Sequence, residues 1–438
     1  MGGIREQVEA VASGAVSAVE AAEAAIARIE AGDGEINAVV VRDFDRALDA
    51  ARAVDARRAK GERLPLLGLP MTVKEAFDVA GLPTSWGLEA HAGAVAETDA
   101  VVVRRLREAG AVIVGKTNVP PSLSDHQSSN PVYGVTHNPH RHGWSPGGSS
   151  GGAAAAVAAG FVAGEVGSDI GGSIRIPASF CGVWGLKPTF GLISKDGHAH
   201  PGTEPHSDEL SVAGPIAGSA GDLDLLLGVL ADHPVPAPTH DDLRGVRVAV
   251  LVDQAQVPLA ASVRTALDES MARFEAAGAI VDREPALPDL AFIGTEYLPM
   301  LMTIMAGGLA LPGQEPLTVR GWFDLLDAQA RTQRGWSAVL ADHYDVVLSP
   351  VFSTPSFPID DVDILGRQLD VDGTAISNVT QLTWIAPAIH TGLPSVAFPA
   401  GRSPDGLPIG FQLMGPRFSD RDLLHLASLV ADPAAVDD

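Results

Sequence analysis

The chain of 438 residues contains few aromatic residues, a single cysteine and no long hydrophobic run. The lone Cys181 excludes an intramolecular disulfide and favours a reducing, cytoplasmic setting. The longest apolar stretch, 153–164, is mostly alanine and glycine and is too short to span a bilayer. No basic segment followed by an apolar one opens the chain, so we expect no signal peptide. These absences predict a cytoplasmic protein that does not enter a membrane.

Positive charge is also scarce. The chain has 30 Lys and Arg residues against 54 Asp and Glu residues, which gives a formal net charge of −24. A field of this sign repels phosphate backbones, so we expect no nucleic-acid partner. The hydrophobic fraction of 46%, by contrast, is typical of a globular protein with a large core.

Apolar segments of strand length alternate with amphipathic segments along the chain. Strands are expected at 36–41, 69–74, 111–114, 161–166, 246–252, 279–282, 345–348, 395–398 and 408–414. Helices are expected at 4–30, 42–60, 98–110, 153–159, 262–277 and 420–430. The alternation predicts one α/β core around a central sheet.

Two glycine-rich segments, 147–152 (GGSSGG) and 168–175 (SDIGGSIR), each contain two serines. Ser173 is a candidate nucleophile, because the glycines before it lack a Cβ and leave backbone N–H groups free to approach a developing oxyanion. Lys74, at the end of an expected apolar strand, is a candidate base. A lysine is a base only when neutral, so the site must lower its reference pKa of about 10.4 by burial. Together these residues favour acyl-transfer chemistry.

Several better-known motifs do not fit. The segment 110–117 (GAVIVGKT) matches a P-loop pattern, but its inner residues predict a buried strand and two prolines follow at 120–121, so we expect no nucleotide site. Arg175 stands where a nucleophile elbow needs glycine, and no lysine follows a serine by three positions. A Ser–His–Asp triad stays open, because its members are remote in sequence.

The histidines gather in two segments rich in proline and glycine. They are His137, His140 and His142, then His198, His200 and His206. Imidazole is a common zinc ligand, but the chain has neither an H-E-x-x-H nor a C-x-x-C pattern. We therefore favour exposed loop histidines over a metal site, with some of them at the mouth of a pocket.

The stretch 146–187 resembles the amidase signature family. Its GGSSGG block is followed at family spacing by GSDIGGSIRIP at 167–177 and by CGVWGLKPT from residue 181. Further blocks in family order are the lysine strand, 114–118, 344–350 and 406–413. The resemblance covers nearly the whole chain and requires several motifs at once.

This resemblance implies one amidase domain over 1–438, an α/β/α fold whose central mixed β-sheet is flanked by helices. The less regular, methionine-containing segment 285–340 is expected to be helical and to contribute to the substrate pocket. The resemblance also implies a Ser–Ser–Lys triad. Ser173 would attack the carbonyl carbon, and Lys74 would be the base. Ser149, which would follow a cis peptide bond from Gly148, would relay a proton to the leaving amine. Such a triad needs no cofactor.

Other site residues follow from the same resemblance. The backbone N–H groups expected to form the oxyanion hole are those of Ile170, Gly171, Gly172 and Ser173. Asp169 and Arg175 are expected to support the nucleophile loop by hydrogen bonds. The substrate contacts expected at the border of the acyl pocket are Leu123, Ser124 and Asp125.

The implied activity is that of a hydrolase of linear amides with an acyl-enzyme intermediate. We expect a small, neutral and hydrophobic amide, while aryl esters and carbamates fit the same mechanism because only the leaving group differs. One alternative is the glutaminase (A-type) subunit of a tRNA-dependent amidotransferase, and another is an inactive binding protein of the same fold. A small-molecule substrate is the expected partner, and a homodimer is one option for the oligomeric state.

Overall fold

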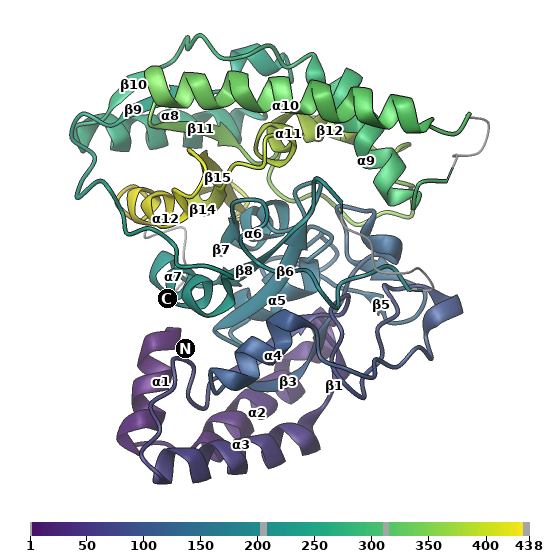
Figure 1. The fold of residues 1–438 in the computed structure, drawn as a ribbon, viewed down its shortest axis with the longest axis vertical. Helices are drawn as coiled ribbons and strands as arrows, with labels where there is room; N and C mark the ends of the chain where they lie inside the picture. The colour runs from purple at the N-terminus through teal and green to yellow at the C-terminus, as the bar shows by residue number, and fades with distance from the viewer. Residues whose placement is uncertain (1, 202–207, 310–314, 432–438) are drawn as a thin grey trace.

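The computed structural model describes residues 2–201, 208–309 and 315–431. Within these ranges the largest element is a mixed sheet of eight strands (Figure 1). Its strands, in sheet order, are β10 (Ile280–Asp282), β9 (Arg247–Val250), β11 (Val346–Pro350), β15 (Pro408–Met414), β14 (Ser395–Arg402), β7 (Trp184–Lys187), β8 (Val212–Ala217) and β6 (Gly164–Asp169). The pairs β10/β9 and β9/β11 are parallel and the other pairs are antiparallel.

A second sheet lies against the β6 edge of the first. It has the order β1 (Val39–Arg42), β3 (Val112–Thr117) and β2 (Pro70–Lys74), with β2 parallel to β3. Side chains of β2 and β6 hydrogen-bond to each other, so the edge strands of the two sheets are neighbours. The remaining strands form the hairpins β4 (Ser129–Asn130) with β5 (Gly134–Val135) and β12 (Gln368–Val371) with β13 (Thr374–Ser377).

Helices flank the sheets on both sides. They are α1 (Ile4–Ser13), α2 (Ala18–Ile36), α3 (Phe44–Ala59), α4 (Val101–Glu108), α5 (Gly151–Ala158), α6 (Arg175–Cys181), α7 (Ala220–Leu230), α8 (Ala261–Ala276), α9 (Leu298–Met305), α10 (Val319–Asp342), α11 (Leu382–His390) and α12 (Asp420–Ser428). Figure 1 shows α1–α3 at one end of the molecule and α10 at the other. The expected fold class, α/β with a mixed central sheet flanked by helices, is confirmed.

Local sequence explains where several helices begin. Ser17 caps α2 in a reciprocal arrangement, in which its hydroxyl accepts from the N–H of Glu20 and the Glu20 carboxylate accepts from the N–H of Ser17. Thr318 caps α10 by accepting from the N–H of Gly321. No described helix is long and apolar enough to cross a membrane.

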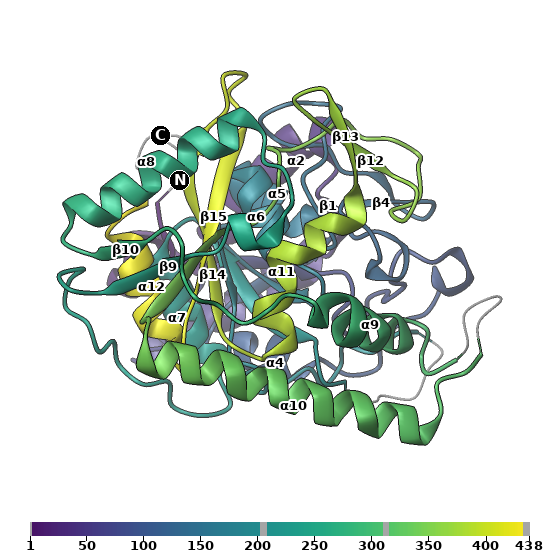
Figure 2. The ribbon, with the colours of Figure 1, turned by 90° about the horizontal axis from the view of Figure 1, so that it is seen from above.

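The segment 285–340 contains more helix than its irregular pattern suggests. The π-helix η4 (Ile293–Tyr297) continues directly into α9, and α10 runs for 24 residues. Figure 2 shows α9, α11 and the β12–β13 hairpin on the same side of the central sheet. These elements therefore lie together although they are distant in sequence.

The buried helix α5 is packed so tightly that it requires small residues. It consists of glycine, alanine and one valine, and residues 151–156 are fully buried. A Cβ at Gly152 would lie 2.3 Å from the backbone nitrogen of Asn118, which is closer than atoms can approach. Because Ser149 comes just before α5, this close packing fixes the serine relative to the neighbouring sheet.

Candidate active site

Lys74 is the last residue of β2, and its side chain is completely buried. Its ammonium nitrogen donates to the hydroxyl of Ser149 at 2.7 Å and to that of Ser168 at 2.9 Å. The peptide bond between Gly148 and Ser149 is cis, as the sequence resemblance led us to expect. The structure thus brings together two of the predicted residues, 75 positions apart, and adds Ser168 as a second partner of the lysine.

The electrostatic setting of Lys74 lowers the pKa of its ammonium group. Burial lowers the pKa of Lys74 to about 7, although the carboxylates of Asp169 and Glu165 act in the opposite direction. Glu165 on β6 is itself fully buried, and both Thr72 and Thr117 donate to its carboxyl group. Burial raises the pKa of Glu165 to about 8. A large fraction of the lysine is therefore neutral at physiological pH.

Ser173 lies in the loop between β6 and α6. Its carbonyl accepts from the backbone N–H of Ser150 at 3.1 Å, so the two glycine-rich segments are in direct contact. Ser173 and Ser149 line the same cavity. Ser173 is 6% exposed, so it is largely buried although it borders that cavity. The predicted nucleophile and the predicted relay serine are therefore neighbours.

A buried ion pair holds this loop in place. Asp169 and Arg175 have side chains with no exposed surface, and their closest charged atoms are 3.0 Å apart. Burial alone would raise the pKa of Asp169, but the guanidinium of Arg175 and backbone donors hold it below its usual value. Arg175 also donates to the side chain of Gln412 at 2.7 Å on β15. The loop is thereby fixed to the central sheet.

The four N–H groups predicted for the oxyanion hole are not equivalent. The N–H of Gly172 donates to Asp169 at 2.8 Å, whereas those of Ile170, Gly171 and Ser173 donate to no other residue in the described parts of the chain. Gly172 has a φ of +95°, and a Cβ there would lie 2.6 Å from Ile176. Gly172 therefore shapes the loop, and three N–H groups stay available to a substrate oxygen.

Two aromatic side chains set the orientation of the loop peptides. The hydroxyl of Tyr297 donates to the carbonyl of Ile170 at 2.9 Å, and the planar peptide then directs the N–H of Gly171 to the opposite side. His126 contacts the carbonyl of Gly171 at 3.4 Å through Nε2, which must carry the proton because a carbonyl only accepts. Burial lowers the pKa of His126, which favours this neutral form.

Two cavities meet at Ser173 and share Leu123, Ile170, Ser173 and Met305 as lining residues. The first cavity, of about 80 Å³, is further lined by Trp86, Ser122, Ser149, Ser168, Asp169, His198, Ala199, His200, Asp208, Ser211 and Ile304. The second, of about 240 Å³, is further lined by Ser124, Asp125, His126, Gly171, Leu298, Leu301, Met302, Asp363, Ile364, Leu365, Val379 and Leu382. The predicted contacts Leu123, Ser124 and Asp125 thus all border a cavity at Ser173.

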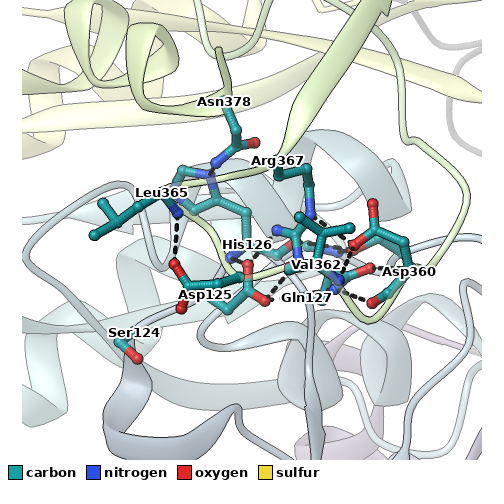
Figure 3. Close-up of polar contacts among 12 residues, drawn as sticks. Ser124, Asp125, His126, Gln127, Asp360, Val362, Leu365, Arg367 and Asn378 are labelled. Carbon is teal, nitrogen blue, oxygen red and sulfur yellow. Dashed lines mark hydrogen bonds and ion pairs between the residues drawn. The ribbon is translucent and has the colours of Figure 1, made fainter.

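The outer wall of the larger cavity is held by Arg367. Its side chain is 1% exposed, and it donates to both carboxylate oxygens of Asp125 and, at 3.0 Å, to Asp360 (Figure 3). Gln127 adds two hydrogen bonds of 2.9 Å to the backbone of Asp360. These contacts join loop 123–127 to segment 360–378, so the wall is built from parts of the chain that are remote in sequence.

The structure corrects the expected exposure of the histidines. Of those described, only His142 in these two segments is exposed, while His137, His140, His198 and His200 are half-buried. Burial lowers the pKa of His198 to about 3, and its ring packs against Trp86 at 4.9 Å. The prediction that some histidines lie at a pocket is confirmed for His198 and His200. His206 lies outside the described residues.

Most of the P-loop-like segment 110–117 forms the buried strand β3, which begins at Val112. Lys116 donates to the carbonyl of Pro83 and, at 3.0 Å, to the hydroxyl of Thr84. The lysine of this pattern therefore has a structural partner in the protein interior.

For several residues of the site the sequence carries no sign of a partner, although Ser168 stands inside the second glycine-rich segment. Sequence reasoning missed Ser168, Glu165, His126, Tyr297 and Arg367 as parts of this arrangement. The available indications were a glutamate inside an apolar strand and an arginine in an otherwise acidic segment, and neither specifies a partner. Only the folded chain shows which groups they contact.

Comparisons with known proteins agree with this geometry. The family model named Amidase matches residues 20–310 and 321–424. AmiB2 of Mycobacterium tuberculosis, described as a putative amidase, is 36% identical over 98% of this chain and 95% of its own. The A-type subunit of the glutamyl-tRNA(Gln) amidotransferase of Moorella thermoacetica is 33% identical over 94% of this chain and 92% of its own.

A solved structure extends the likeness to the fold. It is that of a bacterial aryl acylamidase belonging to the amidase signature enzymes, with a TM-score of 0.84, 25% identity, and coverage of 98% of this chain and 95% of that one. The similarity thus spans both glycine-rich segments and the outer wall of the larger cavity. The chain belongs to the amidase signature family and is an amidohydrolase that acts on carbon–nitrogen bonds other than peptide bonds.

Proposed function

We propose that this enzyme hydrolyses a small, neutral and hydrophobic carboxylic amide through a Ser–Ser–Lys triad and an acyl-enzyme intermediate. The observation that carries the proposal is the 2.7 Å hydrogen bond from the buried Lys74 to Ser149, which lines the same cavity as Ser173. The lowered pKa of Lys74, about 7, supports its role as the base.

In the first half-reaction the hydroxyl oxygen of Ser173 attacks the carbonyl carbon. Its proton passes to Ser149 as the proton of Ser149 passes to neutral Lys74. The tetrahedral intermediate collapses when Ser149 donates a proton to the amine nitrogen, the carbon–nitrogen bond breaks, and Lys74 returns a proton to Ser149. Water then attacks the acyl-enzyme by the same proton route and releases the acid.

Backbone donors stabilise the negative oxygen in both steps. The N–H groups of Ile170, Gly171 and Ser173 are available for this role, and each such donor is worth about 3 kcal/mol. The N–H of Gly172 is already used by Asp169, so we assign it to the shape of the loop.

The walls of the two cavities favour a neutral, apolar substrate. Their described lining includes leucine, isoleucine, methionine and tryptophan side chains but neither lysine nor arginine. Glutamine carries an α-carboxylate that needs a cationic partner. The likeness to the A-type amidotransferase subunit is the reason to keep the glutaminase alternative, and the lack of a cation on the described lining counts against it.

We extend the proposal to the whole chain. Residues 1–438 would act as one amidase domain, in which α9, from the segment 285–340, supplies part of the substrate pocket. Aryl esters and carbamates would react by the same acylation step. A cytoplasmic location and a small-molecule partner fit the single cysteine and the acidic charge.

The test is hydrolysis of a panel by the wild type, Ser173→Ala and Lys74→Ala. The panel contains a primary amide, an anilide, a p-nitrophenyl ester, an aryl carbamate and glutamine. Lys187→Met is the matched control, because Lys187 is also a fully buried lysine with a pKa lowered to about 7. Its nitrogen, however, donates to the carbonyl of Pro188, and it lines neither cavity.

We expect both triad variants to lose turnover of the amide and the ester, and Lys187→Met to keep it. Labelling by a fluorophosphonate should depend on Ser173. Full activity of Ser173→Ala contradicts the assignment, and turnover of glutamine alone supports the amidotransferase alternative.

A further inference from the structure

The two cavities at Ser173 differ in size and in chemistry. We name the larger one, of about 240 Å³, the acyl lobe and the smaller one, of about 80 Å³, the amine lobe, with the lining residues given above. The acyl lobe is lined mainly by apolar side chains of α9 and of the segment 364–382. The amine lobe has apolar lining residues as well, among them Trp86 and Ile304, but it carries more serine and histidine side chains than the acyl lobe. An amide placed at Ser173 can therefore occupy the site in two orientations.

The proton relay selects between these orientations. Ser149 and Ser168, the two hydroxyl partners of Lys74, line only the amine lobe. Gly171, whose N–H is free to bind the oxyanion, lines only the acyl lobe. The amine nitrogen must receive its proton from Ser149 before it leaves, so the nitrogen and its substituent lie on the Ser149 side. The acyl group then extends into the larger lobe.

Size decides which groups each lobe accepts. An apolar cavity of about 150 Å³ is enough to hold a benzene ring. The acyl lobe exceeds this volume and the amine lobe is only about half of it. The acyl lobe thus has room for an aryl or branched alkyl group, and the amine lobe has room for ammonia or a small alkylamine.

Polar contacts reinforce the difference. In the amine lobe Asp208 is paired with Lys195 at 2.5 Å and accepts from the hydroxyl of Ser211, so contacts within the protein fix this polar part of the lining. In the acyl lobe the wall at Asp125 is fixed by Arg367, which is 1% exposed, and this contact keeps the lobe formed before substrate binds.

We propose that the enzyme selects primary amides, or amides of small alkylamines, of apolar carboxylic acids with an aryl or branched alkyl group, rather than amides of aryl amines. This inference rests on the proposed function, because it uses Ser149 as the donor to the leaving nitrogen. It deepens that function by assigning the two halves of the substrate to named lobes.

Phenylacetamide and acetanilide provide the first test, because they are isomers that place the same ring on opposite sides of the amide. Phenylacetamide carries the ring on the acyl side and releases ammonia, while acetanilide carries it on the nitrogen and releases aniline. Aniline is the easier leaving group, so a preference for phenylacetamide cannot arise from leaving-group chemistry. We expect kcat/KM for phenylacetamide to exceed that for acetanilide by at least about tenfold.

Two variants of α9 then test the lobes separately. Met302 lines the acyl lobe and Ile304 the amine lobe, and each is absent from the described lining of the other. In Met302→Trp we expect kcat/KM to fall at least about tenfold for phenylacetamide and by less than about threefold for acetamide. In Ile304→Trp we expect the ratio of kcat/KM for phenylacetamide to that for acetamide to stay as in the wild type. We expect kcat/KM for N-ethylacetamide to fall relative to that for acetamide.

The outcomes separate this inference from the proposed function. If Ser173 is labelled by a fluorophosphonate and acetanilide is the better substrate, or if Met302→Trp impairs acetanilide rather than phenylacetamide, the lobes are assigned wrongly although the enzyme is an amidase of the proposed type. If Ser173→Ala keeps full activity, the proposed mechanism fails and the lobe assignment fails with it.

Discussion

The inner part of the site and its outer wall are built from different kinds of sequence. The inner part comprises Lys74 on β2 and the segments 147–152 and 168–175, most of whose residues are buried. The outer wall comprises the loop 123–127, α9 and the segment 360–382. The inner part uses short glycine-rich motifs, whereas the wall uses single residues of ordinary appearance from distant places.

This difference separates chemistry from selectivity. The proposed nucleophile, relay and base need a fixed mutual geometry, and buried hydrogen bonds and ion pairs hold the segments that carry them. The wall only needs a shape, which many side chains can provide, so it can vary without loss of the reaction. We therefore expect changes in the inner part to affect stability or turnover, and changes in the wall to affect which substrate is accepted.

The largest effect is expected for Asp169→Asn, which removes the charge partner of Arg175 where both side chains have no exposed surface. An uncompensated buried charge costs about 3–5 kcal/mol. Urea unfolding followed by circular dichroism should show this loss of stability. A loss below about 1 kcal/mol would mean that Gln412 and the carbonyl of Ile385 suffice to hold Arg175.

The pH dependence of kcat/KM tests the inner part without a mutation. Lys74 acts only when neutral and its pKa is lowered to about 7, so activity should be constant above this pH and should fall about tenfold per unit below it. At about pH 5 the loss should be about a hundredfold. The groups that act on this lysine are Asp169, Glu165 and His198. If the midpoint of the acidic limb of this pH profile lay near the ordinary lysine pKa of about 10.4, burial would not lower the pKa of Lys74.

The outer wall is tested by Arg367→Ala, which leaves Asp125 and Asp360 without their shared cation. Because both carboxylates are partly exposed, we expect the free energy of unfolding to fall by about 2 kcal/mol, which is less than the full cost of a buried charge. The preference for phenylacetamide over acetanilide should shrink while turnover of acetamide persists. Arg367→Lys is the matched control, because it keeps the positive charge. If Arg367→Ala left the substrate preference unchanged, the contact between Arg367 and Asp125 would have no role in selectivity.

The smallest effect is expected at the junction of the two parts. Tyr297→Phe removes the hydroxyl that donates to the carbonyl of Ile170 at 2.9 Å, and so loosens the peptide that presents the N–H of Gly171. Direct removal of one oxyanion donor costs about 10²–10³ in kcat, so an indirect effect should be about tenfold in kcat with little change in KM. A change in KM alone would instead place Tyr297 in substrate binding.

The secondary structure could be predicted where periodicity is clear and not where glycine or proline interrupts it. The expected helices at 42–60 and 262–277 match α3 and α8. Strand β8 contains Gly214 and Pro215, and α11 contains Pro387, so neither was expected. Both are buried, and tertiary packing outweighs their weak local preference.

By itself, the sequence determined the α/β class, the family and the candidate residues Lys74, Ser149 and Ser173, because strand and helix periodicity and the glycine–serine segments are local patterns. Only the tertiary structure decided that Ser168 contacts Lys74, that Tyr297 and His126 contact the carbonyls of the loop after β6, and that Arg367 joins Asp125 across 242 positions. The physical reason is that these contacts, and the burial that lowers the pKa of the lysine, arise from the packing of segments remote in sequence.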